Sequence, residues 1–157
     1  MQKIKIILVG KTKEKYCQLA EQEFLKRLQR YTNVEICIVR EEKMTRQKPD
    51  AQIRAIEFER IQAQIEGNDY LILLDKSGKQ FSSEALAKEL QSLALKGISK
   101  LCFVIGGPLG FPEAFLKQAN QVLSFSKMTF THEMIRMLLL EQLYRAFTIL
   151  NNEKYHK

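Results

Sequence analysis

The chain has 157 residues, of which 45% are apolar and 27% are charged. This composition is ordinary for a globular protein and excludes a disordered or fibrous chain. The formal net charge is +7, and residues 1–48 hold most of it, with twelve lysines and arginines against six acidic residues. A basic region on a small protein favours a polyanionic partner such as a nucleic acid, but a solvated helix face on a mildly basic protein fits equally well.

No targeting or membrane-spanning segment is expected. The apolar run at residues 6–9 is too short for a signal peptide, and no stretch approaches the roughly 20 apolar residues of a membrane helix. Cys17, Cys37 and Cys102 lie far apart, at spacings that suit neither a disulfide framework nor a zinc site. We therefore expect a cytoplasmic protein with free thiols, without a bound metal, folded as a single domain over residues 1–157.

Strand and helix patterns alternate along the whole chain. The apolar patterns predict strands at residues 3–9, 34–39, 70–74, 101–105 and 121–125. They predict helices at residues 13–31, 50–67, 82–97 and 132–150, and a short helix opened by Pro112. A polar loop is expected at residues 40–48 and a turn at residues 75–78. Regular alternation of this kind predicts an α/β domain with a mostly parallel sheet and helices on both faces.

The last predicted helix, at residues 132–150, is apolar on nearly every side. Such a helix must be buried by something, and a domain this small offers limited cover. We therefore expect part of it to pack against a second copy of the chain in a homodimer. Within this helix, Glu141 and Arg145 have the spacing of an ion pair.

Ligands of open parallel sheets bind beyond the carboxyl ends of the strands, and three of the predicted ends are unusual. Leu74 and Asp75 precede a glycine turn, residues 105–110 contain paired glycines, and residues 124–130 lead directly into the last helix. Paired glycines allow a ligand to approach the backbone closely. These three ends are the predicted ligand site.

Two nucleotide-binding motifs are excluded by their spacing. Gly10-Lys11-Thr12 follows a strand, but Lys5 stands where a P-loop needs its first glycine. The glycines at positions 106, 107 and 110 lack the spacing of the dinucleotide fingerprint and occur late in the chain. Neither a P-loop nucleotidase nor a nicotinamide enzyme is expected.

Three segments together resemble one known family. They read FVIGGPLG at 103–110, LSFSKMTFTHEMIRMLLLEQLYRAFTIL at 123–150, and YHK at the end of the chain. The sequence resembles the small SPOUT-class methyltransferases that modify a pseudouridine of bacterial large-subunit ribosomal RNA. The resemblance covers the whole chain and is most specific from Leu101 onward. It implies a trefoil knot within about residues 70–157, a homodimer, and methylation of N3 of a pseudouridine in the 23S RNA of assembled ribosomes.

The same resemblance implies S-adenosylmethionine as the cofactor, bent into the loops at the three strand ends. Backbone groups and apolar side chains would hold the adenine, and Lys127 could instead meet RNA. Three departures from the family pattern, at Thr131, Asn152 and Lys154, are expected to alter the path of the loop and tail and to leave the cofactor site intact. The positions carried over for cofactor binding are Leu74, Gly106, Phe125, Ser126, Lys127, Met128, Thr129 and Phe130.

The implied reaction needs alignment of the base nitrogen with the methyl group and loss of a weakly acidic proton. We predict that His156 and Tyr155, on the C-terminal tail, lie near the target base. The alternative is a tail without a fixed position. Arg136 is predicted to contact a phosphate or the base. His132 is expected to order the start of the last helix, or else to touch the substrate.

Two other functions stay open at the level of sequence. A non-catalytic RNA-binding or ribosome-assembly domain could keep this fold, although the intact glycine turn and the Ser-x-Ser-x-Met-Thr loop at residues 124–129 argue against it. A related SPOUT enzyme could act on transfer RNA. The lack of an extra RNA-binding domain favours a large substrate that supplies its own shape complementarity.

Overall fold

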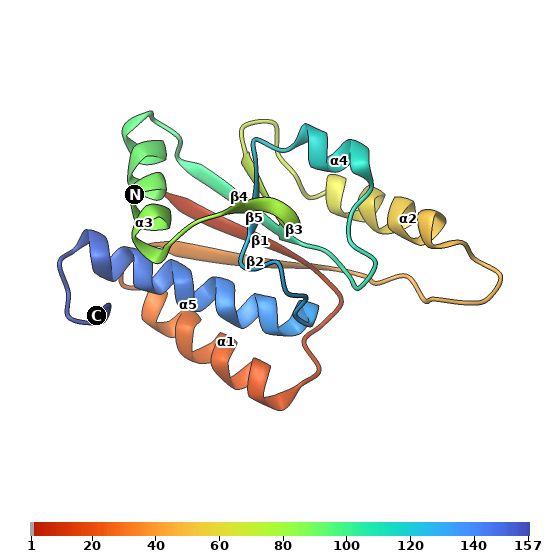
Figure 1. The fold of residues 1–157 in the computed structure, drawn as a ribbon, viewed down its shortest axis with the longest axis horizontal. Coiled ribbons are helices and arrows are strands. Elements are labelled where there is room, and N and C mark those ends of the chain that lie inside the picture. The colour runs from red at the N-terminus through yellow and green to blue at the C-terminus, as the bar shows by residue number, and fades with distance from the viewer. Residues whose placement is uncertain (1) are drawn as a thin grey trace.

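The computed structural model describes residues 2–157 and consists of one parallel sheet between two layers of helices. The sheet has the order β2-β1-β4-β3-β5. Figure 1 shows α1, α3 and α5 on one face and α2 and α4 on the other. The strands are β1 (Lys3–Val9), β2 (Asn33–Val39), β3 (Tyr70–Gln80), β4 (Lys100–Ile105) and β5 (Gln121–Ser124). The helices are α1 (Lys15–Leu28), α2 (Asp50–Gln62), α3 (Ser83–Leu95), α4 (Glu113–Gln118) and α5 (His132–Leu150).

The expected α/β architecture with a parallel sheet and helices on both faces is confirmed. Central strands are apolar on both sides because successive side chains point to opposite faces. Ile6, Leu8 and Phe103 enter the core beneath α1, α3 and α5. Ile7 and Val104 enter the second core, beneath α2 and α4. The knot itself stays a prediction from the family resemblance.

Helix α3 begins and ends where the sequence predicts. The Ser82 hydroxyl accepts a hydrogen bond from the amide of Ala85 at 3.0 Å, which caps the first turn. Gly97 follows the helix with a φ of 82°, the left-handed conformation that commonly ends a helix.

Helix α2 ends at Gln62 and not at Gly67, so the predicted end is wrong. The segment that follows the helix makes contacts distant in sequence. The Glu66 carboxylate pairs with Lys5 at 3.3 Å and with Lys100 at 2.6 Å, at the starts of β1 and β4. These ion pairs connect the segment after the helix to the starts of both strands.

The turn expected at residues 75–78 is a bulge within a longer strand. The ladder between β3 and β5 changes register between Leu74 and Lys79, and both of these residues pair with Leu123. The Asp75 carboxylate accepts hydrogen bonds from the amide and hydroxyl of Ser77, which is the local bonding of an aspartate turn. The bulge ends one wall of the ligand site described next.

Helix α5 lies against α1 and α3 and is the longest helix among residues 2–157. Its observed bounds are those predicted from the sequence. The expected Glu141–Arg145 ion pair is also present. No helix in the described part of the chain is long and apolar enough to cross a membrane.

Candidate active site

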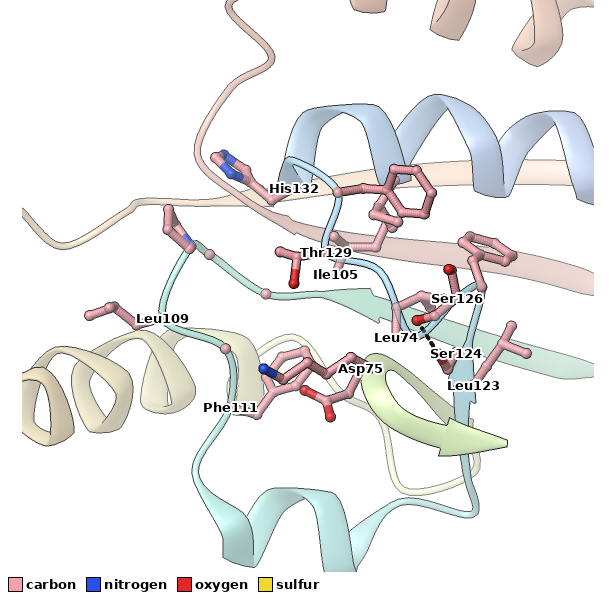
Figure 2. Close-up of a pocket in the computed structure, with 18 of the residues that line it drawn as sticks. Leu74, Asp75, Ile105, Leu109, Phe111, Leu123, Ser124, Ser126, Thr129 and His132 are labelled. Atoms are coloured by element: carbon pink, nitrogen blue, oxygen red, sulfur yellow. Dashed lines mark hydrogen bonds between the residues drawn. The ribbon is translucent and has the colours of Figure 1, made fainter. Parts of the chain in front are cut away.

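The carboxyl ends of β3, β4 and β5 open into a pocket of about 290 Å³. Its walls are the end of β3 at residues 74–76, the segment after β4 at residues 105–111, and the segment 123–130 after β5. The first turn of α5 closes it with His132 and Ile135. Figure 2 shows labelled residues of these four segments around the pocket. The three strand ends singled out in the sequence therefore meet in one place.

Seven of the eight positions carried over for cofactor binding line this pocket, and Lys127 does not. Lys127 is exposed, because it lies at the tip of a tight turn closed by the Met128 amide and the Ser126 hydroxyl at 3.0 Å. The seven positions are Leu74, Gly106, Phe125, Ser126, Met128, Thr129 and Phe130.

Hydroxyl groups hold the segment between β5 and α5 in its curved path. The Ser124 hydroxyl donates to the carbonyl of Ser126 at 2.9 Å. The Thr131 hydroxyl accepts from the amide of Met134 at 3.1 Å and caps α5. The repeated serines and the threonine therefore shape the backbone of this wall.

The glycine turn after β4 is tightly packed at Gly106 and Gly107. A Cβ atom on Gly106 would come within 3.0 Å of the Phe111 ring, and one on Gly107 within 3.0 Å of the Glu57 carboxylate. Gly110 has a φ of 74°, and its amide donates to the carbonyl of Gly107 at 3.0 Å. Close packing and a tight turn require these glycines, and the backbone facing the pocket stays bare.

Several pocket residues were not among the predicted positions. Asp75 places the only carboxylate of the described pocket wall beside Gly110. The sequence could have indicated Asp75 as a site residue, because it directly follows the last buried residue of β3 at the carboxyl end of the apolar run. Phe111, Leu123 and Ile135 are apolar residues whose sequence pattern does not distinguish them from the core.

His132 is the one histidine in the wall of this pocket. Partial burial lowers the pKa of its imidazole, and the nearby Arg136 guanidinium lowers it further. The ring is therefore neutral at neutral pH and has a free lone pair to accept a proton. His132 lines the pocket from the first turn of α5, and its expected role in ordering the helix start stays a prediction.

Arg136 is buried, although the sequence predicts contact with a phosphate or the target base. Its side chain is only 2% exposed. The guanidinium donates to the carbonyl of Val9 at 2.7 Å and to the hydroxyl of Thr12 at 2.9 Å. The carbonyl at the end of β1 draws this arginine inward, so in this structure it ties α5 to the β1–α1 loop.

Glu133 makes a second tie between the same two segments. Its carboxylate accepts from the amides of Lys13 at 2.7 Å and Glu14 at 2.9 Å, where α1 has no side-chain cap of its own. Burial raises the pKa of Glu133, but these amide donors and Arg136 outweigh burial and lower it overall. The carboxylate therefore stays ionised and holds the start of α1.

The C-terminal tail is packed against the molecule. The Tyr155 hydroxyl donates to Glu141 at 3.0 Å, and its ring lies 4.8 Å from the ring of Tyr144. His156 lies 2.8 Å from the Glu84 carboxylate and 3.3 Å from the Arg145 guanidinium.

The tail and the pocket lie at different ends of α5, as Figure 1 shows. Ile135 lines the pocket, whereas Arg145 contacts His156, and roughly 15 Å of helix separates them. Asn152 starts the tail with a φ of 56°, a left-handed conformation that asparagine tolerates. One copy of the chain does not bring the predicted tail residues to the pocket.

Metal ligands do not gather around this site. Within residues 2–157, no group of three or more histidine, cysteine, aspartate or glutamate side chains could hold a metal ion. The described cysteines are free thiols, and Cys17 and Cys102 are buried in the core.

Comparison with known proteins points in one direction. The model of a family described as "Predicted SPOUT methyltransferase" matches residues 2–156. A ribosomal RNA large subunit methyltransferase H from Halothermothrix orenii is 48% identical, over 99% of this chain and 99% of that protein. One of the same name from Enterococcus faecalis is 44% identical over 99% of each. A solved structure of a probable methylase family protein from Haemophilus influenzae has a TM-score of 0.52 at 15% identity, covering 96% of this chain and 67% of that one, and supports the fold alone.

Proposed function

Because this chain belongs to the SPOUT methyltransferase family, we propose that it methylates N3 of a pseudouridine in large-subunit ribosomal RNA, with S-adenosylmethionine as the donor. The observation that carries the proposal is the pocket at the ends of β3, β4 and β5, where the glycine turn and the segment 123–130 face each other. The near full-length similarity to ribosomal RNA large subunit methyltransferases H supports the choice of RNA.

The residues of the pocket suit the chemical parts of S-adenosylmethionine. Leu74, Ile105 and Leu109 offer apolar surface to the adenine, next to the bare backbone of the glycine turn. The Asp75 carboxylate can attract the positively charged part or accept from the ribose hydroxyls. The sulfonium of the cofactor supplies an activated methyl group, so the protein needs to supply position and a proton acceptor.

Proton removal from the base is assigned to the histidines of this chain. His132 lies in the pocket wall and is neutral at neutral pH, which suits an acceptor. His156 and Tyr155 remain proposed contacts of the target base, with the tail held in place by Glu84 and Glu141. Arg136 positions the first turn of α5 from within the core, in place of a direct contact with RNA.

A homodimer is part of the proposal. The tail of one copy lies away from its own pocket, so a second copy is needed to bring tail and pocket together. Met128 is 76% exposed beside the pocket, and Tyr16 and Leu19 on α1 are 54% and 55% exposed. Exposed apolar side chains near α5 give such a dimer surface to bury.

Basic loops surround the pocket opening and supply contacts for the RNA backbone. The β1–α1 and β2–α2 loops both leave the carboxyl edge of the sheet, the same edge at which the pocket opens. Neutralised phosphates release counterions, so binding should weaken steeply with salt. A ribosomal substrate would place the enzyme in the cytoplasm. The exposed basic residues of these loops are Lys11, Lys13, Arg40, Lys43 and Arg46.

Labelled S-adenosylmethionine tests the proposal. The purified protein is incubated with intact ribosomes, isolated subunits, stripped ribosomal RNA or transfer RNA, and the labelled nucleotide is identified by mass spectrometry. We expect label at N3 of a pseudouridine of the large-subunit RNA when intact ribosomes are supplied. Label in transfer RNA instead would show that transfer RNA, and not ribosomal RNA, is the substrate. Absence of both labelling and cofactor binding would favour a non-catalytic RNA-binding domain. His156→Ala should reduce transfer while leaving cofactor affinity unchanged.

A further inference from the structure

The loop between β2 and α2 is long, exposed and basic. Residues 40–48 hold four lysines and arginines against two glutamates, and Figure 1 shows them as a loop that projects beyond α2. Residues 41–44 line a hollow beside the cofactor pocket, and the two spaces share Pro108 and Leu109 as a wall. An RNA whose target base enters the pocket would therefore pass close to this loop.

Glu42 attaches this loop to α2 through both its main chain and its side chain. Its amide donates to the Glu57 carboxylate at 3.1 Å. Its own carboxylate accepts from Arg60 at 2.8 Å and from Lys48 at 3.3 Å. Arg60 also donates to the carbonyl of Arg40 at 3.0 Å. The start and the end of the loop are thus bonded to each other and to α2.

The ion pairs of Glu42 are partly shielded from water. The side chains of Glu42, Lys48 and Arg60 are 19%, 28% and 23% exposed, so salt screens these pairs less than pairs on an open surface. Hydrogen bonds from Lys48 and Arg60 lower the pKa of the Glu42 carboxyl group, against the opposing effect of burial. The carboxylate is therefore ionised at neutral pH, and two cations of this protein balance its charge.

The cations at the tip of the loop have no such partner. Lys43 and Arg46 are exposed and form no ion pair within residues 2–157. Surface loops are ordinarily mobile, and a partner that binds one must first order it. Because Glu42 bonds the loop to α2, the segment that carries these two cations is already ordered before RNA binds, which favours binding.

We propose that Glu42 is a positioning residue that holds Lys43 and Arg46 against phosphates of the RNA beside the target base. This deepens the proposed RNA methyltransferase function and rests on it. Lysine and arginine bind phosphate oxygens without reading the base, so the loop fixes the register of the RNA against the pocket. An acidic residue thereby promotes binding of an acidic partner, which is the opposite of what its charge alone predicts.

Three variants separate position from charge. Glu42→Gln removes the ion pairs and raises the net charge by one. Glu59→Gln raises the net charge equally, but Glu59 is an exposed residue of α2 without a side-chain hydrogen bond or ion pair in the described part of the chain, so it is the matched control. Arg60→Lys keeps the net charge, but an ammonium lacks the planar fork that reaches both Arg40 and Glu42.

The proposal predicts opposite effects of the two charge-matched variants. We expect the KM for ribosomes to rise about threefold or more in Glu42→Gln and Arg60→Lys, and to stay equal or fall in Glu59→Gln. The amides of residues 43–47 should exchange with deuterium faster in the first two variants, because the loop is released. The affinity for S-adenosylmethionine, measured by calorimetry, should match the control in each variant.

Lys43→Ala gives a readout that a purely structural role of Glu42 would not move. Alone, it should raise the KM and reduce the salt dependence of ribosome binding by about one phosphate contact. Combined with Glu42→Gln, it should have a smaller effect, because the lysine is no longer held in place.

Three results would overturn the proposal while the wild-type protein remains active. They are additive effects of Lys43→Ala and Glu42→Gln, a KM of Glu42→Gln that stays equal or falls like that of Glu59→Gln, and a KM of Arg60→Lys equal to that of the wild type. Absence of RNA methylation by the wild-type protein would instead overturn the proposed function, and this inference with it.

Discussion

Gly78→Ala should destabilise the protein and weaken cofactor binding together. Gly78 lies in the bulge of β3, against the backbone of β5. A Cβ on Gly78 would lie 2.6 Å from the carbonyl carbon and oxygen of Val122, both main-chain atoms that cannot rotate away. Ordinary contact begins at 3.4 Å, so β5 would have to retreat by roughly 0.8 Å. Overpacking of this kind costs about 1–3 kcal/mol.

The displaced strand leads directly into a wall of the pocket. Residues 123–130 follow the point of contact and supply much of the pocket surface. The melting temperature should therefore fall by roughly 2–12 °C, and affinity for S-adenosylmethionine should fall with it. Scanning calorimetry and titration calorimetry measure the two effects.

Gly67→Ala is the matched control for this prediction. Nothing lies within 4 Å of a Cβ at Gly67, and its φ is not positive. This variant should be neutral or more stable by about 0.4–1 kcal/mol, because alanine restricts the unfolded chain. If the two variants melted at the same temperature and bound the cofactor equally, the close approach of β3 to β5 would have no energetic weight and the reasoning would be wrong.

Three further predictions follow from the same site. Arg136→Lys should lower the free energy of unfolding by about 1.5–3 kcal/mol in urea titrations, because one ammonium cannot replace both hydrogen bonds of the guanidinium. An unchanged urea midpoint would show that these buried hydrogen bonds do not stabilise the fold. Lys127→Ala should bind the cofactor like the wild type in calorimetry and lose affinity only for ribosomes. His132 has a pKa below its usual 6.5 or so. Its neutral state is thus favoured by folding, and stability should decline as pH falls through this range toward the folded-state pKa. His132→Gln should reduce that decline. Identical pH–stability curves for the wild type and His132→Gln would refute this prediction.

Local signals were sufficient to predict much of the fold. The bounds of β1 and α5 match the expected ranges because apolar periodicity and a capping threonine define them within the segment itself. The end of α2 could not be predicted in this way. The segment after this helix pairs through Glu66 with Lys5 and Lys100, and only the folded sheet brings these lysines together.

The candidate site was predicted in position more accurately than in side-chain direction. Parallel strands deliver their carboxyl ends to one edge, so the three unusual ends had to meet. Whether a side chain in such a loop faces inward depends on the turn. The bond between Ser126 and Met128 turns Lys127 outward, although its neighbours line the pocket. One partner of Arg136 is the main-chain carbonyl of Val9, which no residue type in the sequence reveals.

The first turn of α5 connects the two parts of the proposed reaction. On one side, His132 and Ile135 line the cofactor pocket. On the other side, Glu133 and Arg136 bind the β1–α1 loop, which carries Lys11 and other exposed cations. Neighbouring residues of one helical turn contact both the pocket and the β1–α1 loop. A shift of the helix start would therefore move the pocket wall and the basic loop together. We therefore predict that the proposed binding of RNA to that loop and the proposed binding of the cofactor are coupled, so that each changes the binding free energy of the other.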